Sequence, residues 1–596
     1  MTAVARDGRG RRGQAQAAVL ALSAYLALAV ALFASTWRAP AVRNIGGAGD
    51  PPMLMWFLHW TPWALVHHHN PFVTDHIGYP GGVNLLWNTT MFLPGLVLAP
   101  VTAALGPVVA YNTFVTANVA VSAWCAFLAF RSFVTRPWVA FVGGLVYGFS
   151  PYMLAQSGEH PNLTAAYLPP LLLVLMAEIV VRQHHPPWRS GAALGALAVV
   201  QLLVTEELLA SEALVAAVGV ALLALLHRDQ VAARARHALR AFAVAGSVFT
   251  VVAAWPMTVQ LFGPQRFTGA AQRPGTFVTD LANLVVPTHV QGLAPGFAVA
   301  RSQWWTGNPL EWNGYLGIPL LGLLVWVTVR LWSRPLVRLA GLLAVTLAVL
   351  SLGPTLHVNG NDTGLPLPWR LFAWMPLAEH LLTNRLMLYV DLLAALLVAL
   401  WIDHLAGSRA ASGRRVAIGA AAVVAALVPL LPALPFPSTP RRVPRFFTTA
   451  AVRRIPEGSV ALIAPWQQVY PADSMLWQAA AGLRFRMAQG TFLGPDEAGR
   501  RMYGAPLSTL SLTMLEVQQG GDAPDLTGDL RSRLAADLAE RRVATIVVGP
   551  MHHRGAMIRL FSELVGRRPE RTGGVAVWWD VAASAPGAGP VAGATR

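Results

Sequence analysis

The sequence lacks lysine altogether and has few charged residues of any kind. Its 596 residues include 44 Lys and Arg, all of them Arg, and 28 Asp and Glu, which gives a formal net charge of +16. Charged residues make up 12% of the chain, against about 25% in a typical soluble domain. Hydrophobic residues make up 55%, and the mean hydropathy is +0.49. A membrane environment explains this composition, so we interpret the Arg clusters between apolar runs as topology determinants and expect no nucleic-acid partner.

Cysteine is almost as scarce as lysine. Cys125 is the only one, and it lies inside an apolar run. A single cysteine excludes an intrachain disulfide, so cysteine content gives no information about the compartment. We expect this thiol to pack within a helix.

Apolar runs of about 17 to 25 residues, separated by short Arg-rich loops, match the hydrocarbon thickness of a bilayer. The basic start, 1–12, directly precedes the run 17–35, which is typical of a signal anchor with a cytoplasmic N-terminus. Ten further spans are expected to begin near Thr113, Trp138, Ala165, Gly191, Glu207, Ala241, Tyr315, Val337, Leu386 and Val416.

The apolar stretch 91–110 decides the number of spans. If it crossed the bilayer, all later Arg-rich loops would lie outside the cell. If it lies along the outer interface or re-enters, five Arg-rich loops lie in the cytoplasm, as the positive-inside rule requires. The sequence therefore predicts an α-helical polytopic membrane protein with eleven transmembrane helices.

The end of the chain differs from the rest. The runs 459–464, 543–548 and 574–579 are typical of buried strands, and they indicate a small α/β domain. An odd number of spans places this domain outside the cytoplasm. The predicted organisation is a basic cytoplasmic N-terminus at 1–14, a membrane domain at 15–433 with its first outer loop at 36–112, a linker at 434–445, an extracytoplasmic α/β domain at 446–582, and a disordered tail at 583–596.

The first outer loop contains the best candidate for a catalytic acid. Asp50 follows three glycines and precedes Pro51 and Pro52, a pair that can start a helix. The stretch 51–67 is apolar and rich in Trp, including Trp56, so we expect a helix in the membrane interface with its rings at headgroup depth. Asp50 would then be positioned as a general base toward an acceptor hydroxyl. Alternatively, Asp50 only caps this helix.

Two further features lie in the same loop. The adjacent residues His67, His68 and His69 could suggest a metal, but neighbours on a helix point apart, so we favour a headgroup-facing run. Asn84 could orient a sugar by hydrogen bonds, or it could satisfy loop backbone groups.

Paired polar residues mark the next outer loops. Glu159 and His160 could bind a phosphate or relay a proton, or they could only stabilise their loop. Glu206 and Glu207 end one apolar run and open the next with almost no loop between. Carboxylates at that depth favour a functional interpretation, because they are costly in lipid.

The third and fourth outer loops offer mixed signals. In the third, Trp304, Glu311 and Trp312 combine aromatic and polar groups as sugar sites do, although we favour an interfacial aromatic belt. In the fourth, Arg385 directly precedes a span against the positive-inside trend, which suits a lipid phosphate. Pairing of Arg385 with Glu379 or Asp391 is the alternative.

Together, a signal anchor, a Gly-Asp50 loop before a Trp-rich helix, many spans and a C-terminal extracytoplasmic domain resemble the GT-C superfamily of membrane glycosyltransferases, above all its actinobacterial members. This resemblance implies a location in the bacterial plasma membrane, a polyprenyl-phosphate sugar donor, and inverting transfer to a glycan, lipid or protein acceptor. It also implies an acid of the first outer loop as the base, and Asp50 is the matching position.

By this resemblance, Asp50 deprotonates the acceptor while Arg385, with His160, stabilises the departing lipid phosphate. Glu206 and Glu207 would orient sugar hydroxyls or a divalent cation. No ligand spacing in the sequence requires such a cation. The candidate binding residues are Trp56, Asn84, Glu159, His160, Glu206, Glu207 and Arg385.

Two other functions fit the composition. A lipid-linked substrate transporter or flippase also uses intramembrane acids, but it predicts broken helices and an inverted repeat. An accessory membrane protein of the YfhO-like type would take part in polymer decoration without being the transferase. A single outward cavity surrounded by Asp50, Glu206 and Arg385 would favour the enzyme.

Overall fold

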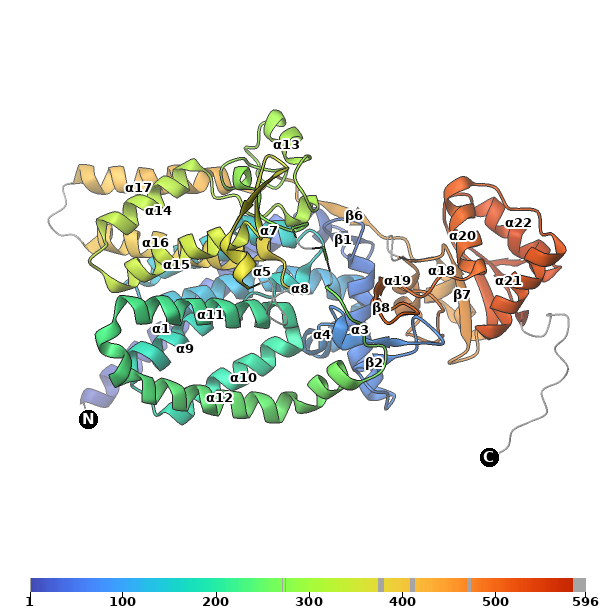
Figure 1. Ribbon diagram of the computed structural model, residues 1–596, viewed down its shortest axis with the longest axis horizontal. Coiled ribbons are helices and arrows are strands. Elements are labelled where there is room, and N and C mark those ends of the chain that lie inside the picture. The colour runs from blue at the N-terminus through green and yellow to red at the C-terminus, as the bar shows by residue number, and fades with distance from the viewer. Residues whose placement is uncertain are drawn as a thin grey trace.

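The structure is a computed structural model that describes residues 2–270, 272–273, 275–372, 380–407, 413–468 and 473–581, with side chains from residue 13 onward. Long helices lie side by side at one end of the molecule, and an α/β domain lies at the other (Figure 1). Between them, a layer of loops and short helices connects the two parts. The predicted tail at 583–596 lies outside the described residues.

The bundle contains long apolar helices. Among the described residues, eight segments are long and apolar enough to cross a membrane. They are residues Gly13–Leu32 of α1 (Thr2–Leu32), α5 (Pro107–Phe130), the run Pro161–Arg182 formed by α8 (Pro161–Thr164), α9 (Leu168–Ala177) and η2 (Glu178–Arg182), α10 (Pro187–Val204), α11 (Glu206–Leu226), α12 (Arg228–Phe262), the run Thr383–Gly407 formed by η7 (Thr383–Leu386) and α16 (Met387–Gly407), and Gly413–Leu430 formed by α17 (Gly413–Leu427) and η8 (Val428–Leu430).

Three expected spans fall on shorter apolar helices, α6 (Pro137–Gly148), α14 (Ile318–Arg330) and α15 (Pro335–Ser351). At 1.5 Å per residue, the 12 residues of α6 reach about 18 Å, short of the roughly 30 Å of a hydrocarbon core. The multi-pass helical membrane protein is thus confirmed, whereas the number of eleven crossings stays a prediction.

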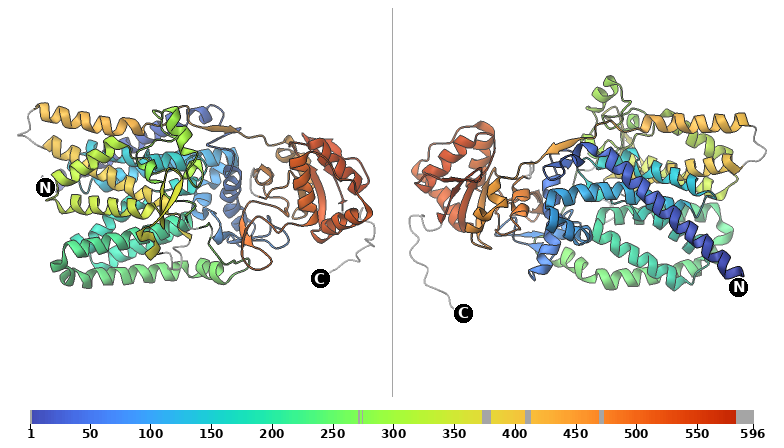
Figure 2. Two further views of the ribbon diagram at one scale, coloured as in Figure 1. Left: turned by 45° about the horizontal axis from the view of Figure 1, so that its top comes forward. Right: turned by 180° about the vertical axis from the view of Figure 1, so that it is seen from behind.

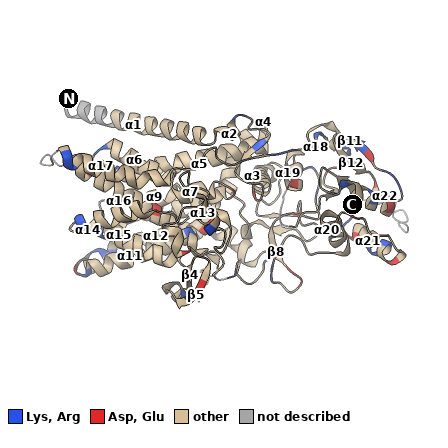
Figure 3. Cartoon of the chain, turned by 90° about the horizontal axis from the view of Figure 1, so that it is seen from above, with Lys and Arg blue, Asp and Glu red and all other residues tan. Residues whose placement is uncertain are grey.

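Arg residues gather at the end of the bundle that lies farthest from the α/β domain (Figure 3). The turns between α11 and α12 and between α14 and α15 both lie at this end, as does the start of α17. This clustering at one end is the distribution that the positive-inside rule describes. The assignment of this end to the cytoplasm stays a prediction.

Helices α3 (Pro51–Val66) and α4 (Phe92–Leu105) come from the first loop, at the domain-facing end of the bundle. α3 runs across the direction of the membrane helices (Figure 1). α4 packs so closely on α3 that a Cβ on Gly95 would lie 2.8 Å from the carbonyl oxygen of Leu58. Gly106 divides the stretch 91–110 into α4 and the first turn of α5.

The position of α3 in the membrane interface stays a prediction, but two of its Trp rings are covered by protein rather than by lipid headgroups. Trp56 and Trp60 are fully buried and stacked, with ring centroids 5.3 Å apart. They are covered because α19 (Asp473–Ala480), from the C-terminal part of the chain, packs on α3, and the indole of Trp56 donates a 2.6 Å hydrogen bond to Gln478. Burial of these rings in protein replaces the expected contact with lipid.

The α/β domain is built on a four-stranded sheet in the order β11-β12-β10-β7. Its strands are β7 (Val460–Ala464), β10 (Val543–Val548), β11 (Glu570–Thr572) and β12 (Val575–Trp578), with β7 parallel to β10 and the other pairs antiparallel. The helices beside it are α20 (Thr509–Gly520), α21 (Gly528–Glu540) and α22 (Arg554–Val565). β7, β10 and β12 coincide with the three runs from which strands were expected, since such apolar, β-branched runs favour buried strands.

The segment 434–445 is ordered by contacts with the first loop, although we expected a simple linker there. Its strand β6 (Ser438–Pro440) pairs with β1 (Arg43–Ile45), and the chain continues directly into α18 (Arg445–Thr448). Further along, backbone hydrogen bonds join 76–79 to 487–489. The first loop thus lies between the bundle and the α/β domain, as both views of Figure 2 show.

Short elements complete the loop layer. They are α2 (Ala34–Trp37), β2 (Val73–Thr74) paired with β3 (Val83–Asn84), η1 (Leu85–Trp87), α7 (Pro151–Gln156), η3 (Leu281–Leu284), α13 (Gly296–Ser302), η4 (Pro309–Glu311), β4 (Thr355–Val358) paired with β5 (Asn361–Pro366), η5 (Pro368–Leu371), η9 (Ala450–Arg454), and β8 (Leu493–Pro495) paired with β9 (Arg501–Tyr503).

Candidate functional site

The glycine-rich segment before Asp50 contacts the loop after α7. Gly46 has a φ of +87°, and a Cβ there would lie 1.6 Å from the carbonyl oxygen of Gly158. Gly47 donates a 2.9 Å hydrogen bond to that oxygen. Only glycine combines this conformation with such a close backbone approach. The glycines therefore bring the start of α3 against the second loop.

Glu159 fixes this contact. One carboxylate oxygen accepts a 3.1 Å hydrogen bond from the amide of Gly49, and the other accepts one of 3.4 Å from the amide of Asp50. Of the two roles considered for Glu159, these contacts fit stabilisation of its loop rather than binding of a phosphate. A carboxylate that accepts two backbone N–H groups is held firmly in place.

Asp50 lies at the N-terminal end of α3, but its side chain makes no capping hydrogen bond. Instead, Asp50 Oδ2 lies 3.4 Å from Nε2 of His160. The contact expected if Asp50 only caps the helix is therefore not formed. Asp50 is held beside an imidazole from a different loop, with its residue 9% exposed.

His160 connects Asp50 to the interior of the site. Its Nδ1 lies 2.7 Å from Oε1 of Gln156 and 3.5 Å from Oε1 of Glu311. The amide nitrogen of Gln156 donates to Glu311, so the amide oxygen is the atom that faces His160. Because that oxygen only accepts, Nδ1 carries a proton, and Nε2 is the ring nitrogen that faces Asp50.

Arg385 completes the site from η7, at the start of α16. Its guanidinium donates to both carboxylate oxygens of Glu311, with 3.3 Å from Nε to Oε2, and also to Glu207 at the start of α11. Asn384 donates a 2.7 Å hydrogen bond to Glu311 as well. Arg385 thus pairs with Glu207 and Glu311. Of its expected partners, Asp391 accepts from the amide of Tyr152, and Glu379 lies outside the described residues.

These contacts form one continuous series of ionisable groups, which we call the charged chain. It runs Asp50, His160, Glu311, Arg385, Glu207, and its members come from the first loop, the loop after α7, η4, η7 and α11. Burial alone would raise the pKa of Glu311, but the charge of Arg385 and the hydrogen bonds from Arg385 and Asn384 outweigh burial and lower it. Glu311 is therefore ionised at neutral pH.

Glu206 has different contacts from its neighbour. It accepts a 2.8 Å hydrogen bond from Gln260 on α12, and Gln260 also donates to the carbonyl of Leu86 in the first loop. Adjacent residues at a helix start point in different directions, so only Glu207 reaches Arg385. Asp50 and Arg385 are thus connected through His160 and Glu311, whereas Glu206 binds α12. The single cavity surrounded by Asp50, Glu206 and Arg385 that would favour the enzyme is therefore not formed with Glu206.

Asn84 forms hydrogen bonds with backbone groups of the loops, which is one of the two roles considered for it. Its side chain accepts from the amide of Leu86 and donates to the carbonyls of Val259 and Pro264, at 2.9 and 3.0 Å. Trp56, another candidate substrate-binding residue, lies beneath α19. In this structure both side chains hold the first loop to its neighbours.

Two charged residues of this region were not predicted to belong to the site. Glu311 was assigned to an aromatic belt, although an acid inside a Trp-rich segment was a usable signal. Arg441 had no signal in the sequence. It is buried, and it donates to Asn44 at 2.5 Å, to the carbonyl of Gly47 at 3.1 Å and to Asp473 at 3.2 Å, so it joins the segment after β6 to the glycines before Asp50.

The described residues contain no group of three or more His, Cys, Asp or Glu side chains arranged to hold a metal ion. His67 and His69 stack on Trp63, with ring centroids at 4.3 and 5.2 Å. The run of three histidines therefore packs partly against an aromatic ring at the end of α3.

The sequence matches the profile of a family described as a domain of unknown function, DUF6311, over residues 24–378. The chain belongs to the DUF6311 family. The matched region includes Asp50, His160, Glu207 and Glu311, and it ends before Arg385 and the α/β domain. The search of curated proteins finds no match.

Solved structures show what fold this DUF6311 chain has. It resembles the arabinofuranosyltransferase AftD from Mycobacteria with a TM-score of 0.53 and 14% identity over 94% of this chain, which spans 41% of AftD. It also aligns with the oligosaccharyltransferase AglB from Archaeoglobus fulgidus, in complex with an inhibitory peptide and a dolichol-phosphate, with a TM-score of 0.45 and 12% identity over 92% of this chain and 71% of AglB. The GT-C resemblance expected from the sequence is confirmed at the level of fold.

Proposed function

We propose that this DUF6311 protein is an inverting membrane glycosyltransferase. In this proposal, it transfers a sugar from a polyprenyl-phosphate donor to a cell-envelope glycan, lipid or protein acceptor on the extracytoplasmic side of the bacterial plasma membrane. The observation that carries the proposal is the charged chain, which links the carboxylate of Asp50 to the guanidinium of Arg385 through His160 and Glu311. The GT-C fold supports the class of reaction.

Asp50 acts as the general base. It takes the proton of the acceptor hydroxyl as the hydroxyl oxygen forms a bond to the anomeric carbon of the donor sugar, and the bond from that carbon to the phosphate oxygen breaks on the opposite face. The proton then passes from Asp50 to Nε2 of His160, 3.4 Å away. Glu311, beside Nδ1, stabilises the imidazolium that forms, as a carboxylate does for the histidine of a catalytic triad.

The polyprenyl phosphate that leaves carries the bonding electrons of the broken bond as negative charge. Arg385 stabilises this charge through N–H groups that are not donated to Glu207 or Glu311, because a guanidinium has five. The two carboxylates hold the guanidinium in one orientation. Glu206 remains our candidate for orienting a sugar hydroxyl or a divalent cation, and Glu159, Trp56 and Asn84 position the first loop.

The test compares wild-type protein with Asp50→Asn in proteoliposomes supplied with radiolabelled polyprenyl-phosphate pentose and hexose and an extract of envelope acceptors. The variant should lose about 10²–10⁴-fold in transfer, the usual contribution of a general base, with an unchanged unfolding temperature. Asp75→Asn, at the first loop's other acid, should transfer normally and serves as the control. Undiminished transfer by Asp50→Asn would remove Asp50 from the mechanism.

The same assay separates the rival functions. Movement of the labelled lipid across the bilayer without a glycosylated product would indicate a flippase. Neither movement nor product, with every sugar donor supplied, would indicate an accessory protein. An active cytoplasmic reporter fused after Pro435 would reverse the proposed topology.

A further inference from the structure

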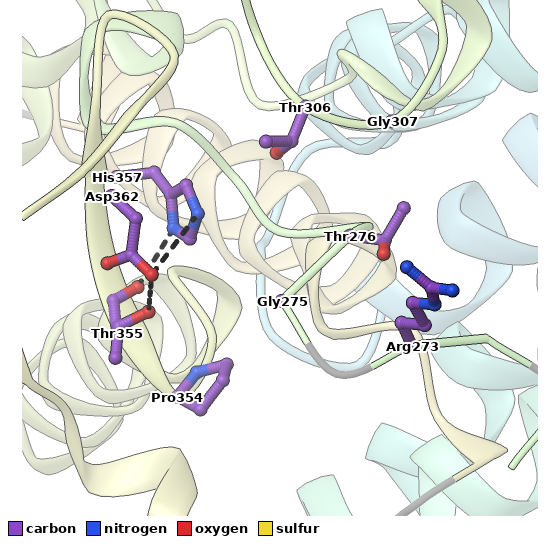
Figure 4. Close-up of a pocket in the computed structure, with 9 residues that line it drawn as sticks. All are labelled: Arg273, Gly275, Thr276, Thr306, Gly307, Pro354, Thr355, His357 and Asp362. Carbon is purple, nitrogen blue, oxygen red and sulfur yellow. Dashed lines mark hydrogen bonds and ion pairs between the residues drawn. The ribbon is translucent and has the colours of Figure 1, made fainter. Parts of the chain in front are cut away.

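A second polar region lies near the charged chain. Three segments border an open pocket of about 540 Å³: the chain after α12, the chain before η4, and the β4–β5 hairpin with the residue before it. Its polar side chains belong to Arg273, Thr276, Thr306, Thr355, His357 and Asp362, and two glycines and Pro354 complete the lining. Figure 4 shows Thr355, His357 and Asp362 on one side of the space and Thr276 and Arg273 on the other.

The walls of this pocket are fixed by backbone contacts. Asp280 is buried and accepts hydrogen bonds from the amides of Asn359 and Gly360 in the turn of the hairpin, at 2.9 and 2.7 Å. Gly360, at a φ of +83°, lies so close to the chain before η4 that a Cβ would be 2.0 Å from the carbonyl oxygen of Trp304. The pocket is therefore formed before any ligand arrives.

The lining selects a class of ligand. Ligand pockets are usually lined mainly by apolar and aromatic side chains, but the described residues that line this pocket include no large aliphatic side chain, and their single aromatic ring is the polar imidazole of His357. A lipid chain would therefore gain little there. Thr276 and Thr306 each offer a hydroxyl that both donates and accepts, and the hydroxyl of Thr355, which donates to Asp362, can accept.

The charges of the pocket balance. Hydrogen bonds from the amide of Gly364 and the hydroxyl of Thr355 lower the pKa of Asp362, so this carboxylate is ionised, and Arg273 carries the opposite charge. The one acidic and the one guanidinium group of the lining thus carry opposite charges. A pyrophosphate or other polyanion would therefore not be neutralised there, whereas an uncharged ligand rich in hydroxyl groups would find matched donors and acceptors.

The pocket shares two walls with the charged chain. The hydroxyl of Thr383, two residues before Arg385, donates to the carbonyl of Phe277, the residue after Thr276. The indole of Trp312, the residue after Glu311, donates a 2.9 Å hydrogen bond to the carbonyl of Thr306. A molecule bound in the pocket would thus lie beside the segments that carry Glu311 and Arg385.

We infer that this pocket binds an uncharged saccharide unit of the acceptor, through the hydroxyls of Thr276, Thr306 and Thr355 and the charged pair Arg273 and Asp362. This inference rests on the proposed function and assigns the pocket as an acceptor subsite. The three threonines would bind single sugar hydroxyls. Asp362 would accept from two neighbouring hydroxyls and Arg273 would donate to sugar oxygens.

The test is saturation-transfer difference NMR of the purified full chain with free arabinose, mannose, galactose and glucose, in a detergent whose headgroup is not a sugar. At least one saccharide should bind wild-type protein. The double variant Arg273→Gln/Asp362→Asn should weaken that binding about tenfold or more, because hydrogen bonds to two charged groups are lost. Thr306→Val, which removes a hydroxyl and changes no charge, should weaken it less.

The control is Arg533→Gln/Asp529→Asn, which changes an exposed pair of the same residue types on α21 and should bind like wild type. Absence of saccharide binding by wild type, undiminished binding by the double variant, or competition by inorganic phosphate would each overturn the inference.

Transfer kinetics distinguish the inference from the proposed function. The Arg273→Gln/Asp362→Asn variant should raise the KM for the acceptor and leave kcat unchanged, whereas Asp50→Asn should lower kcat. Transfer by wild type with no effect of the pocket variant on KM would overturn the acceptor subsite and leave the glycosyltransferase proposal intact. Saccharide binding that the pocket variant weakens, without transfer by wild type, would support a sugar site and overturn the enzyme.

Discussion

The charged chain and the saccharide pocket lie side by side, yet they are held together in different ways. In the charged chain, Asp50 lies beside His160, and Arg385 pairs with Glu311 and Glu207, so the side chains position one another. In the pocket, backbone hydrogen bonds to Asp280 position the walls, and side chains such as Arg273 face the open space. Removal of Arg385, which pairs with two acids, should therefore destabilise the protein, whereas pocket side chains can change with little effect on folding.

The largest effect is expected for Arg385→Met. This change leaves Glu311 and Glu207 buried without their cation, and breaking one partner of a buried ion pair costs about 3–5 kcal/mol. Thermal unfolding of the detergent-purified protein measures the loss. Arg533→Met, in an exposed pair on α21, is the control and should unfold like wild type. Equal unfolding temperatures for the two variants would show that the charged chain is not held by pairing.

The next effect is expected for Gly46→Ala. The left-handed conformation costs a residue with a Cβ about 1–2 kcal/mol, and the clash with Gly158 adds about 1–3 kcal/mol through a backbone shift. Transfer should fall as well, because the shift moves Asp50 away from His160.

Gly458→Ala is the matched control, since Gly458 has a φ of +70° and no atom within 4 Å of its Cβ position. It should show the conformational cost alone, with normal transfer. A Gly46→Ala protein that unfolds and reacts like Gly458→Ala would show that the close contact of the two loops does not position Asp50.

A smaller effect is expected for Asp280→Asn. Asp280 accepts from three backbone amides, including that of Ala282, and the neutral amide weakens these bonds, so the free energy of unfolding should fall by about 1.5–3 kcal/mol. Saccharide binding should weaken because the hairpin that carries His357 and Asp362 loosens. Binding by NMR and thermal unfolding check both effects. Unchanged binding would mean that Asp280 does not fix the pocket.

The smallest effect is expected from pH. The pKa of Glu311 is lowered in the folded protein, so its contribution to stability is fully present above its unfolded pKa of roughly 4.3 and is lost as the pH falls through the folded value. The difference in unfolding temperature between wild type and Glu311→Gln should therefore be constant from about pH 6 to 8. A difference that shrinks within this window would show that Glu311 titrates near neutrality.

Local patterns predicted individual elements well where one local force dominates. The apolar runs became helices, eight of them among the described residues long enough to cross a bilayer, and the runs at β7, β10 and β12 became strands. Pro51 and Pro52 began a helix directly after Asp50, as expected. The environment of α3 could not be predicted in this way, because the α19 residues that cover Trp56 follow it by more than 400 positions.

A multi-pass membrane protein with Asp50 at the start of a Trp-rich helix could be predicted from local sequence alone, since hydropathy, Arg placement and proline act over short distances. The contacts of His160 with Asp50 and of Arg385 with Glu311 and Glu207 depend on how the loops fold together. Ion pairs form wherever the fold brings opposite charges within a few ångströms, and the spacing of two residues along the chain does not predict whether this happens. The threonines of the saccharide pocket could not be predicted for the same reason, because they come from three separate segments that only the fold brings together.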